Sequence, residues 1–205
     1  MRTIAYIDGF NLYFGIRSAF GRRFYWLDVV QLMENVLRPG QHLLHTHYFT
    51  ARIRQNGHNV ADVDRQNNYL DALLARPGLS IHEGHFLQKT AHCNACGATW
   101  PQYEEKMTDV NIAVQLLSDA FDNLFDVALV VSGDSDLTTP IRRLKTRFPS
   151  KKVVAVFPPR RHSNELMRAA DAYFAINEIK LRHSLLPDPV VTPAGIVLRR
   201  PATWR

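Results

Sequence analysis

The chain has very little cysteine and no long apolar segment. Its 205 residues include two cysteines, at positions 93 and 96, so the disulfide framework of a small secreted domain is excluded. No apolar run approaches the ~20 residues of a membrane-spanning helix. The opening residues, MRTIAYIDGF, lack the basic and apolar segments of a signal peptide. We therefore expect a cytoplasmic protein in a reducing compartment, with no membrane partner.

An excess of acidic residues is missing as well. Lysine and arginine number 25 against 19 aspartates and glutamates, which gives a net charge of +6 and a pI near 9.5. Much of this charge is arginine, whose planar guanidinium binds phosphate through paired hydrogen bonds. The charge favours RNA or another nucleic acid as the partner, although an inert basic surface explains it equally well. With 46% hydrophobic and 21% charged residues, the chain has the composition of a globular protein.

Short apolar segments rich in β-branched residues alternate with amphipathic helical patterns. The strand candidates are residues 3–8, 43–50, 79–86, 127–133 and 153–157. The helical patterns cover residues 26–37, 60–75, 109–124 and 137–148. This alternation is typical of βαβ units, so we predict an α/β fold with a doubly wound, mostly parallel sheet flanked by helices.

The end of the chain differs in composition from the rest. After about residue 180 the sequence is rich in proline and arginine and has no helical period. We therefore predict one main domain over residues 1–180, and an extended or mobile tail over residues 181–205.

Carboxylates follow two of the predicted strands. Asp8 ends the segment 3–8, and Asp134 and Asp136 come directly after the segment 127–133. Ligands of doubly wound sheets bind outside the carboxyl ends of the strands, where the strand order reverses. Because both segments are apolar enough to be central, we expect these three carboxylates to be neighbours. Asp109, which begins a helical pattern, reaches the same crevice if that helix packs over the sheet.

Such a cluster of carboxylates favours a bound cation. Like charges are costly to bury without a counter-charge, and hard cations such as Mg²⁺ and Mn²⁺ prefer oxygen ligands. Each aspartate alone also has an ordinary structural explanation. Asp109 and Asp136 can cap helices, and Asp8 can belong to a turn with Gly9. The metal hypothesis therefore depends on their convergence.

Three motifs in the same order resemble those of the NYN domain family, a branch of the PIN-like nucleases. They are YIDGFNLYFG, EEKMTDVNIAVQLLSDA and VVSGDSDLTTPIRRLK, and VVAVFPPRRHSNELMRAADAYFAI resembles the family's last strand and helix. The resemblance covers residues 2 to about 180 and implies a PIN-like fold. It also implies metal-dependent ribonuclease chemistry. The residues that it assigns to the metal are Asp8, Asp109, Asp134 and Asp136.

The same resemblance implies roles for neutral and basic neighbours of these carboxylates. Asn11 would orient a ligand or a water, and Ser132 would brace the acidic loop. Lys106 would contact phosphate, unless it is simply a solvated lysine at a helix start.

Residues 82–103 form a Cys/His-containing insertion relative to a minimal domain of this kind. Cys93 and Cys96, with Gly97, make a C-x-x-C-G knuckle, which is half of a tetrahedral zinc site. The further ligands nearby in sequence are His82, His85 and His92. We predict either a structural Zn²⁺ site or a pair of reduced thiols in a loop or hairpin. A third possibility is that another chain supplies the remaining ligands of this half-motif.

Basic residues gather after two of the predicted strands. In the segment PPRRHS we predict that Arg160, Arg161 and His162 bind the RNA backbone. Ser163 is expected to begin a helix whose backbone N–H groups face phosphate. Arg142 and Arg143 lie on an amphipathic pattern and are more typical of a solvated helix face. Several aromatic residues either stack on bases or belong to the core, namely Tyr13, Phe14, Phe24, Tyr25 and Trp26.

Together these observations favour a metal-dependent endoribonuclease that hydrolyses RNA phosphodiester bonds at the carboxyl ends of the strands. The main alternative is an RNA- or protein-binding regulator that keeps the fold without turnover. A phosphatase with an aspartate nucleophile is disfavoured, because DGFN lacks a second aspartate two residues after the first. The sequence does not decide between a monomer and a homo-oligomer.

Overall fold

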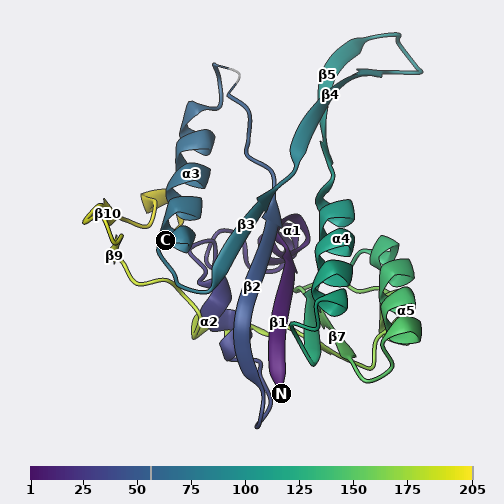
Figure 1. Cartoon of the computed structure of the whole chain (residues 1–205). Coiled ribbons are helices and arrows are strands. Elements are labelled where there is room, and N and C mark those ends of the chain that lie inside the picture. Colours follow the sequence, from purple (N-terminus) through teal and green to yellow (C-terminus); the bar gives the residue numbers. More distant parts are fainter. Residues whose placement is uncertain (56, 205) are drawn as a thin grey trace.

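The centre of the molecule is one six-stranded parallel sheet (Figure 1). The structure is a computed structural model that describes residues 1–55 and 57–204, with the side chains of 88, 89 and 101–105 outside that description. The strands run in the order β3-β2-β1-β6-β7-β8. Their bounds are β1 Arg2–Asp8, β2 His42–Thr50, β3 Leu79–Glu83, β6 Val127–Val131, β7 Lys152–Phe157 and β8 Ala172–Ala175.

β1 is the central strand of this sheet. It pairs in parallel with β2 on one side and with β6 on the other, so Ile7 lies between Tyr48 and Val131. Every residue of β1 after Arg2 is buried, as expected for a strand covered on both faces. The chain adds β2 and β3 on one side of β1 and later adds β6, β7 and β8 on the other. This order places a switch point between β1 and β6 and confirms the predicted doubly wound α/β fold.

Helices cover both faces of the sheet and create two hydrophobic cores. Alternate side chains of β1 point to opposite faces, so Ala5 and Ile7 belong to one core and Ile4 and Tyr6 to the other. The first core contains residues of α1 Gly9–Phe20, α2 Val29–Glu34, α3 Val60–Leu74 and α7 Glu178–Arg182. The second contains residues of α4 Thr108–Phe121, α5 Thr138–Arg147 and α6 Asn164–Ala169.

Two local features differ from the sequence prediction. The helix α1 was not predicted, because its two glycines lower helix propensity and Asp8 with Gly9 suggested a turn. The segment 79–86, predicted as one strand, is interrupted at Gly84, whose N–H donates to the Thr50 carbonyl. After this break, β4 His85–His92 and β5 Thr99–Lys106 form an antiparallel hairpin that projects from the body of the molecule, here called the arm (Figure 1).

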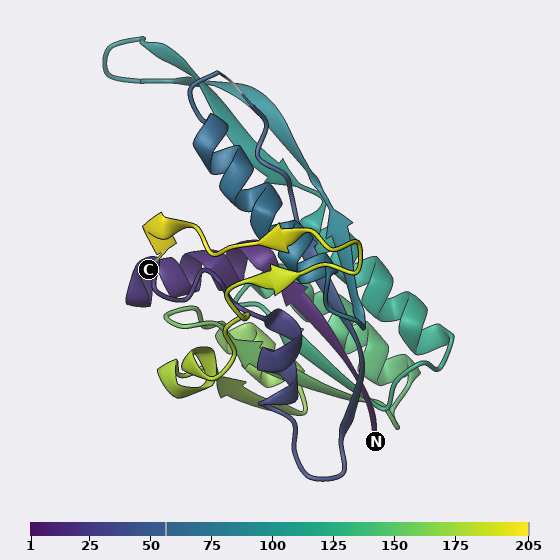
Figure 2. The same ribbon diagram turned by 90° about the vertical axis from the view of Figure 1, so that its left-hand side faces the viewer.

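The C-terminal segment is folded onto the body instead of forming a mobile tail. It contains β9 Val190–Val191, β10 Val197–Leu198 and the short helix η2 Ala202–Trp204, and Figure 2 shows it turned back beside α3. Leu186, Val190 and Trp204 are buried in the first core. The Trp204 ring packs edge-on against Tyr25. Apolar residues spaced among the prolines therefore anchor a segment that has no helical period.

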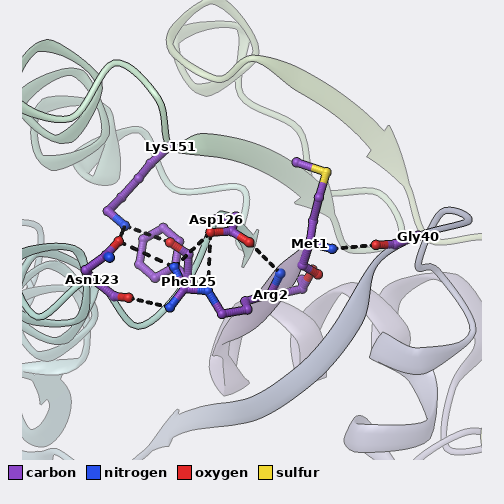
Figure 3. Close-up of polar contacts among 8 residues, drawn as sticks. Met1, Arg2, Gly40, Asn123, Phe125, Asp126 and Lys151 are labelled. Carbon is purple, nitrogen blue, oxygen red and sulfur yellow. Dashed lines mark hydrogen bonds and ion pairs between the residues drawn. The ribbon is translucent and has the colours of Figure 1, made fainter.

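The amino edge of the sheet is held by a polar network that includes Arg2 and Asp126 (Figure 3). Arg2 donates from its backbone N–H and guanidinium to Asp126, and Lys151 Nζ donates to the Phe125 carbonyl at 2.7 Å. The same lysine lies 4.9 Å from the centre of the Phe125 ring. Burial lowers the pKa of Lys151, and the nearby Arg2 charge lowers it further.

In the described part of the chain, no helix is long and apolar enough to cross a bilayer.

Candidate active site

Asp8 and Asp134 are linked through a serine at the carboxyl edge of the sheet. Asp8 ends β1 with only 2% of its surface exposed, and Ser132 directly follows β6. Ser132 Oγ donates to Asp8 Oδ2 at 2.9 Å and accepts from the Asp134 N–H at 3.0 Å. The parallel pairing of β1 with β6 therefore brings the two predicted carboxylate segments together, as expected from their positions after neighbouring strands.

Asn11 makes a second bridge between the same two segments. It lies in the first turn of α1, and its Nδ2 donates to Asp8 Oδ2 at 2.6 Å while its backbone N–H donates to Asp8 Oδ1 at 2.9 Å. Its Oδ1 accepts from the Gly133 N–H at 3.2 Å. We refer to Asp8, Asn11, Ser132 and Asp134 as the acidic edge.

The acidic edge concentrates negative charge among neutral donors. Burial raises the pKa of Asp8, the charge of Asp134 raises it further, and the hydrogen bonds from Asn11 and Ser132 act in the opposite direction. Within the described residues, no lysine, arginine or histidine forms an ion pair with Asp8, Asp134 or Asp136. A cation would complement the charge of these carboxylates.

The donor set of the acidic edge fits a hydrated hard cation. All its ligand atoms are oxygens, which Mg²⁺ and Mn²⁺ prefer, and Mg²⁺ commonly binds through one or two carboxylates while keeping several waters. Among the residues that the structure describes, no group of three or more His, Cys, Asp or Glu side chains is gathered closely enough to hold a metal. The fit is therefore to a site with two protein carboxylates and several waters, not to a complete protein cage.

Asp136 and Asp109 lie on elements that border the acidic edge. Asp136 belongs to the short helix η1 Ser135–Leu137, is exposed, and donates its N–H to Asp134 Oδ1 at 3.0 Å. Asp109 is half-buried in the first turn of α4, which packs against both β1 and η1. Figure 1 shows α4 beginning at the carboxyl edge, where the arm joins it. A shared ion between Asp109 and Asp134 stays a prediction.

The loop after β7, which carries Arg161 and His162, lies against the loop after β6, which carries Gly133 and Asp134. A Cβ atom on Gly133 would come within 2.9 Å of Arg161 Cβ and 3.2 Å of the His162 backbone nitrogen. The side chains of Arg161 and His162 are exposed. Arg160 is also exposed, but its Nη1 donates to the Ser18 carbonyl at 2.8 Å. The backbone of the loop thus lies beside Gly133, while the Arg161 guanidinium lies 5.9 Å from the centre of the Phe14 ring and the His162 ring lies 4.6 Å from that of Phe157.

The other predicted contacts of this region have defined places. Ser163 caps α6, and its Oγ accepts from the Leu166 N–H at 3.3 Å, which confirms it as the start of a helix. Lys106 closes β5 two residues before α4. Arg142 and Arg143 are both exposed on α5, as expected for its solvated face.

An aromatic cavity of about 370 Å³ opens beside the acidic edge, at Gly9 and Phe10. Of the residues predicted to stack on bases or to join the core, four line this cavity, namely Tyr13, Phe14, Phe24 and Tyr25. Trp26 is a core residue with 1% exposure. The guanidinium-bearing residues Arg17, Arg22 and Arg65 also line the cavity. Its walls therefore combine ring faces with positive charge.

Gly9 allows α1, which carries part of the cavity wall, to begin directly after Asp8 of the acidic edge. A Cβ atom at this position would come within 2.7 Å of the Phe49 carbonyl oxygen and 2.8 Å of the Tyr48 ring. The residue after Asp8 must therefore lack a side chain for α1 to begin against β2.

A buried chain of tyrosine, aspartate and histidines crosses the sheet on the second core's face. Tyr6 Oη donates to Asp119 Oδ2 at 2.7 Å, and His47 Nε2 lies 3.2 Å from the same oxygen. His47 Nδ1 lies 2.9 Å from His82 Nε2. We call Tyr6, Asp119, His47 and His82 the histidine chain. Sequence analysis missed it, although the alternation His-Thr-His in β2 places His45 and His47 on one face.

The histidine chain shifts the protonation of its members. Burial opposes the charged form of Asp119, but hydrogen bonds with His47, Tyr6 and Gln115 outweigh it and lower the pKa of this carboxyl. Burial lowers the pKa of His82, and the neighbouring His47 lowers it further. His45 lies beside the histidine chain, with its ring centre 4.7 Å from that of His47, and burial likewise lowers its pKa.

The predicted zinc ligands are separated in the structure. His82 lies in β3 and is engaged with His47, while His85 pairs with Lys106 at the base of the arm. Cys93 and Cys96 lie beyond the other end of β4, at the tip of the arm. Only His92, the last residue of β4, is adjacent to them. A site completed by His82 and His85 is therefore not formed, because these residues belong to the sheet edge and the arm base.

Comparison with known proteins identifies relatives for most of the chain. The sequence profile of the NYN domain matches residues 2–178. The chain is 27% identical over 178 residues to the 6-hydroxy-3-succinoylpyridine 3-monooxygenase HspA of Pseudomonas putida, an alignment that covers 71% of this chain and 56% of that protein. The chain thus spans about half the length of this relative.

A solved structure supports the fold independently. A crystal structure of a Vibrio parahaemolyticus protein of unknown function superposes with a TM-score of 0.54 and 20% sequence identity. The match covers 90% of this chain and 96% of that one. At this identity the likeness extends to the fold alone.

Proposed function

Because the chain belongs to the NYN domain family, we propose that it is a divalent-metal-dependent endoribonuclease that hydrolyses RNA phosphodiester bonds at the acidic edge. The observation that carries this proposal is the link from buried Asp8 through Ser132 to the Asp134 loop, in a place where the described residues supply no ion-pair partner. The relation of the family to nucleases gives the reaction class, and the net charge of +6 favours a polyanionic substrate.

Asp8 and Asp134 would hold Mg²⁺ or Mn²⁺, with Asp109 and Asp136 as further oxygen donors. When bound, such an ion activates water and neutralises charge that builds on the phosphate. Ser132 and Asn11 hold the Asp8 carboxylate in one orientation, because both donate to Oδ2 and the Asn11 backbone donates to Oδ1. These neutral donors therefore act as positioning residues for the ligand carboxylate.

The loop after β7 would bind the RNA backbone next to the acidic edge. Arg161 and His162 are exposed and lie against Gly133, which supports a contact between their side chains and a phosphate next to the one bound at Asp134. Arg160, Lys106 and the amino end of α6 after Ser163 would extend this basic surface, with Arg160 held by its hydrogen bond to the Ser18 carbonyl.

The aromatic cavity would hold an unpaired base next to the cleaved bond. Base stacking on aromatic side chains contributes about 1–3 kcal/mol per base and requires little sequence preference. Tyr13 and Phe14 are 39% and 41% exposed, so an incoming base has access to their rings. Arg17 and Arg22 would add positive charge for the adjoining phosphates, whereas Arg65 is ion-paired with Asp62, which also lines the cavity.

The proposal is tested by assaying cleavage of single-stranded and structured RNAs with Mn²⁺, Mg²⁺ or EDTA. The wild type should cleave with Mn²⁺ or Mg²⁺ and be inactive in EDTA. Asp134→Asn should reduce cleavage at least 100-fold (on the order of the loss seen when one charge-stabilising group is removed) while the circular dichroism spectrum is unchanged. Asp122→Asn, an exposed residue after the end of α4, is the matched control and should keep full activity. Equal cleavage by Asp134→Asn would reject the proposal.

A second candidate function is a binding protein without turnover, for RNA or for a small aromatic molecule. The aromatic cavity supports this candidate, and the Pseudomonas putida relative is a 6-hydroxy-3-succinoylpyridine 3-monooxygenase, named for a pyridine compound. The alignment covers 56% of this relative, so its activity is not carried over to this chain. Metal-independent RNA binding without cleavage, or a thermal shift with 6-hydroxy-3-succinoylpyridine and none with RNA, would favour the second candidate.

A further inference from the structure

The tip of the arm is a closed turn that carries both cysteines of the chain. The Cys93 N–H donates to the Ala98 carbonyl at 2.8 Å, and the Gly97 N–H donates to the Cys93 carbonyl at 2.8 Å. Gly97 has a φ of +71°, a conformation that favours glycine. This closed turn holds Cys93 and Cys96 on one loop, and both are free thiols.

The turn also prepares one sulfur for metal binding. The Cys93 sulfur is hydrogen-bonded to the Cys96 side chain, and the backbone N–H groups of Cys96 and Ala95 donate to the same sulfur. N–H donors that point at sulfur stabilise the thiolate, which is the form that ligates metals. The turn therefore offers two adjacent soft donors that suit Zn²⁺.

Among the side chains of one arm that the structure describes, Cys93 and Cys96 supply two of the four ligands that tetrahedral zinc requires. In the part of the chain that the structure describes, no third His, Cys, Asp or Glu joins the two cysteines in a metal-binding group. The backbone pairing places Glu104 and Glu105 opposite Leu87 and Phe86, several residues down the arm from Cys93. At about 3.3 Å per residue, these positions lie far from the tip.

The missing donors can come from a second copy of this chain. The arm projects away from the sheet, so its tip is free of the body of the molecule (Figure 1). Trp100, which pairs with Ala91 next to the turn, is 49% exposed. A two-fold axis through the metal would bring two knuckles and two such tryptophans together, giving four thiolates and an apolar contact.

We propose that Cys93 and Cys96 form a zinc half-site, and that two copies of the chain join through their arm tips in a shared Zn(Cys)₄ centre. This centre is remote from the acidic edge and does not depend on the nuclease proposal. It assigns the arm a role as a dimerisation element, with Zn²⁺ as the ligand.

The test measures zinc content and mass on the full chain purified with a non-thiol reductant. The expected result is about one zinc per two chains in a dimer, with conversion to a zinc-free monomer after treatment with a chelator. Replacement of the metal by Co²⁺ should give the intense visible bands of tetrahedral thiolate coordination. Cys96→Ser should lose both the metal and the dimer, whereas Asn94→Ala, in the same turn, should keep both. Asp134→Asn should also keep both, which separates this result from the nuclease assay.

Three outcomes would overturn the proposal. They are a reduced wild-type chain that binds no zinc, a monomer that binds one zinc per chain, and a dimer that persists in Cys96→Ser without metal. A monomer with one zinc would show that donors within one chain complete the site.

Discussion

Ser132 Oγ lies 2.9 Å from Asp8 Oδ2 and also accepts the Asp134 N–H, so one hydroxyl joins the ends of β1 and β6. Together with Asn11, which donates to both oxygens of Asp8, this hydroxyl fixes the orientation of the buried carboxylate. It also ties the loop that carries Asp134 to the central strand of the sheet.

Ser132→Ala should therefore weaken both the fold and the proposed metal site. Asp8 would lose a donor while staying buried, which costs about 1–3 kcal/mol of unfolding free energy. Mn²⁺ affinity should fall by about 10- to 100-fold, as for the loss of an outer-shell partner. Chemical denaturation and calorimetric titration measure the two effects.

The neighbouring residue Ser135 provides the control for this change. It is exposed in η1, so Ser135→Ala should leave stability within about 0.5 kcal/mol of the wild type and should not alter Mn²⁺ affinity. If both serine variants behave alike, Ser132 does not position Asp8.

Arg161→Ala should weaken RNA binding without changing the chemical step. Its exposed side chain lies beside Gly133, and loss of one phosphate contact should reduce the slope of log affinity against log salt by about 0.7–1. Fluorescence anisotropy at several salt concentrations, with Ca²⁺ in place of Mn²⁺, measures this slope. Arg143→Ala on the solvated face of α5 should leave it unchanged, and an unchanged slope in Arg161→Ala would place the RNA track elsewhere.

Tyr13→Ala should reduce affinity for RNA that carries bases more than for RNA with abasic residues. The ring lines the aromatic cavity, and removal of one stacking platform costs about 1–3 kcal/mol per base. Phe121→Ala, an exposed ring at the end of α4, is the control for general loss of an aromatic. An equal loss for normal and abasic RNA would argue against a base in the cavity.

The histidine chain predicts a fall in stability on acidification. The pKa values of His45 and His82 are lowered in the native state, mainly by burial, so the unfolded chain binds more protons just below their ordinary value of about 6.5. The two neutral histidines therefore contribute fully to the free energy of unfolding above that pH. This contribution is lost as the pH falls through their lowered pKa values in the native state. The lowered pKa of Asp119 adds a loss of the same sign at more acidic pH.

His82→Gln should make the free energy of unfolding less dependent on pH between about 7 and 5, because one of the shifted rings is gone. The amide keeps a donor toward His47 Nδ1, so the remaining chain Tyr6, Asp119 and His47 stays paired. Denaturation curves at several pH values measure the slope. His183→Gln, exposed after α7, controls for the loss of one histidine, and an unaltered slope in His82→Gln would show that His82 does not couple to folding.

Particular residues show how far the sequence could predict this molecule. β1 and β6 were predictable because they are apolar, β-branched segments, and the rule for parallel strands then placed Asp8 near Asp134. The helix α1 was not, because its stability comes from the Asp8 cap and from burial of Leu12 and Ile16 against the sheet. Those are tertiary effects that propensity does not contain.

The histidine chain could not be predicted for a similar reason. Tyr6, His47, His82 and Asp119 come from three strands and one helix, so only the strand order and the placement of α4 bring them together. Likewise, the burial of Trp204 depends on a cluster of rings, including Tyr25 and Tyr69, that forms only after the C-terminal segment folds back.

The central claim is that one divalent ion binds between Asp8 and Asp134. Diffraction from crystals grown with Mn²⁺, collected for the anomalous signal of manganese, tests it most directly. We predict an anomalous peak within ~2.0–2.4 Å of a carboxylate oxygen of each aspartate, a distance typical of hard cations bound by oxygen ligands, and no peak there in Asp134→Asn crystals. A wild-type crystal with no manganese peak at this edge, or with peaks only at other carboxylates, would contradict the account.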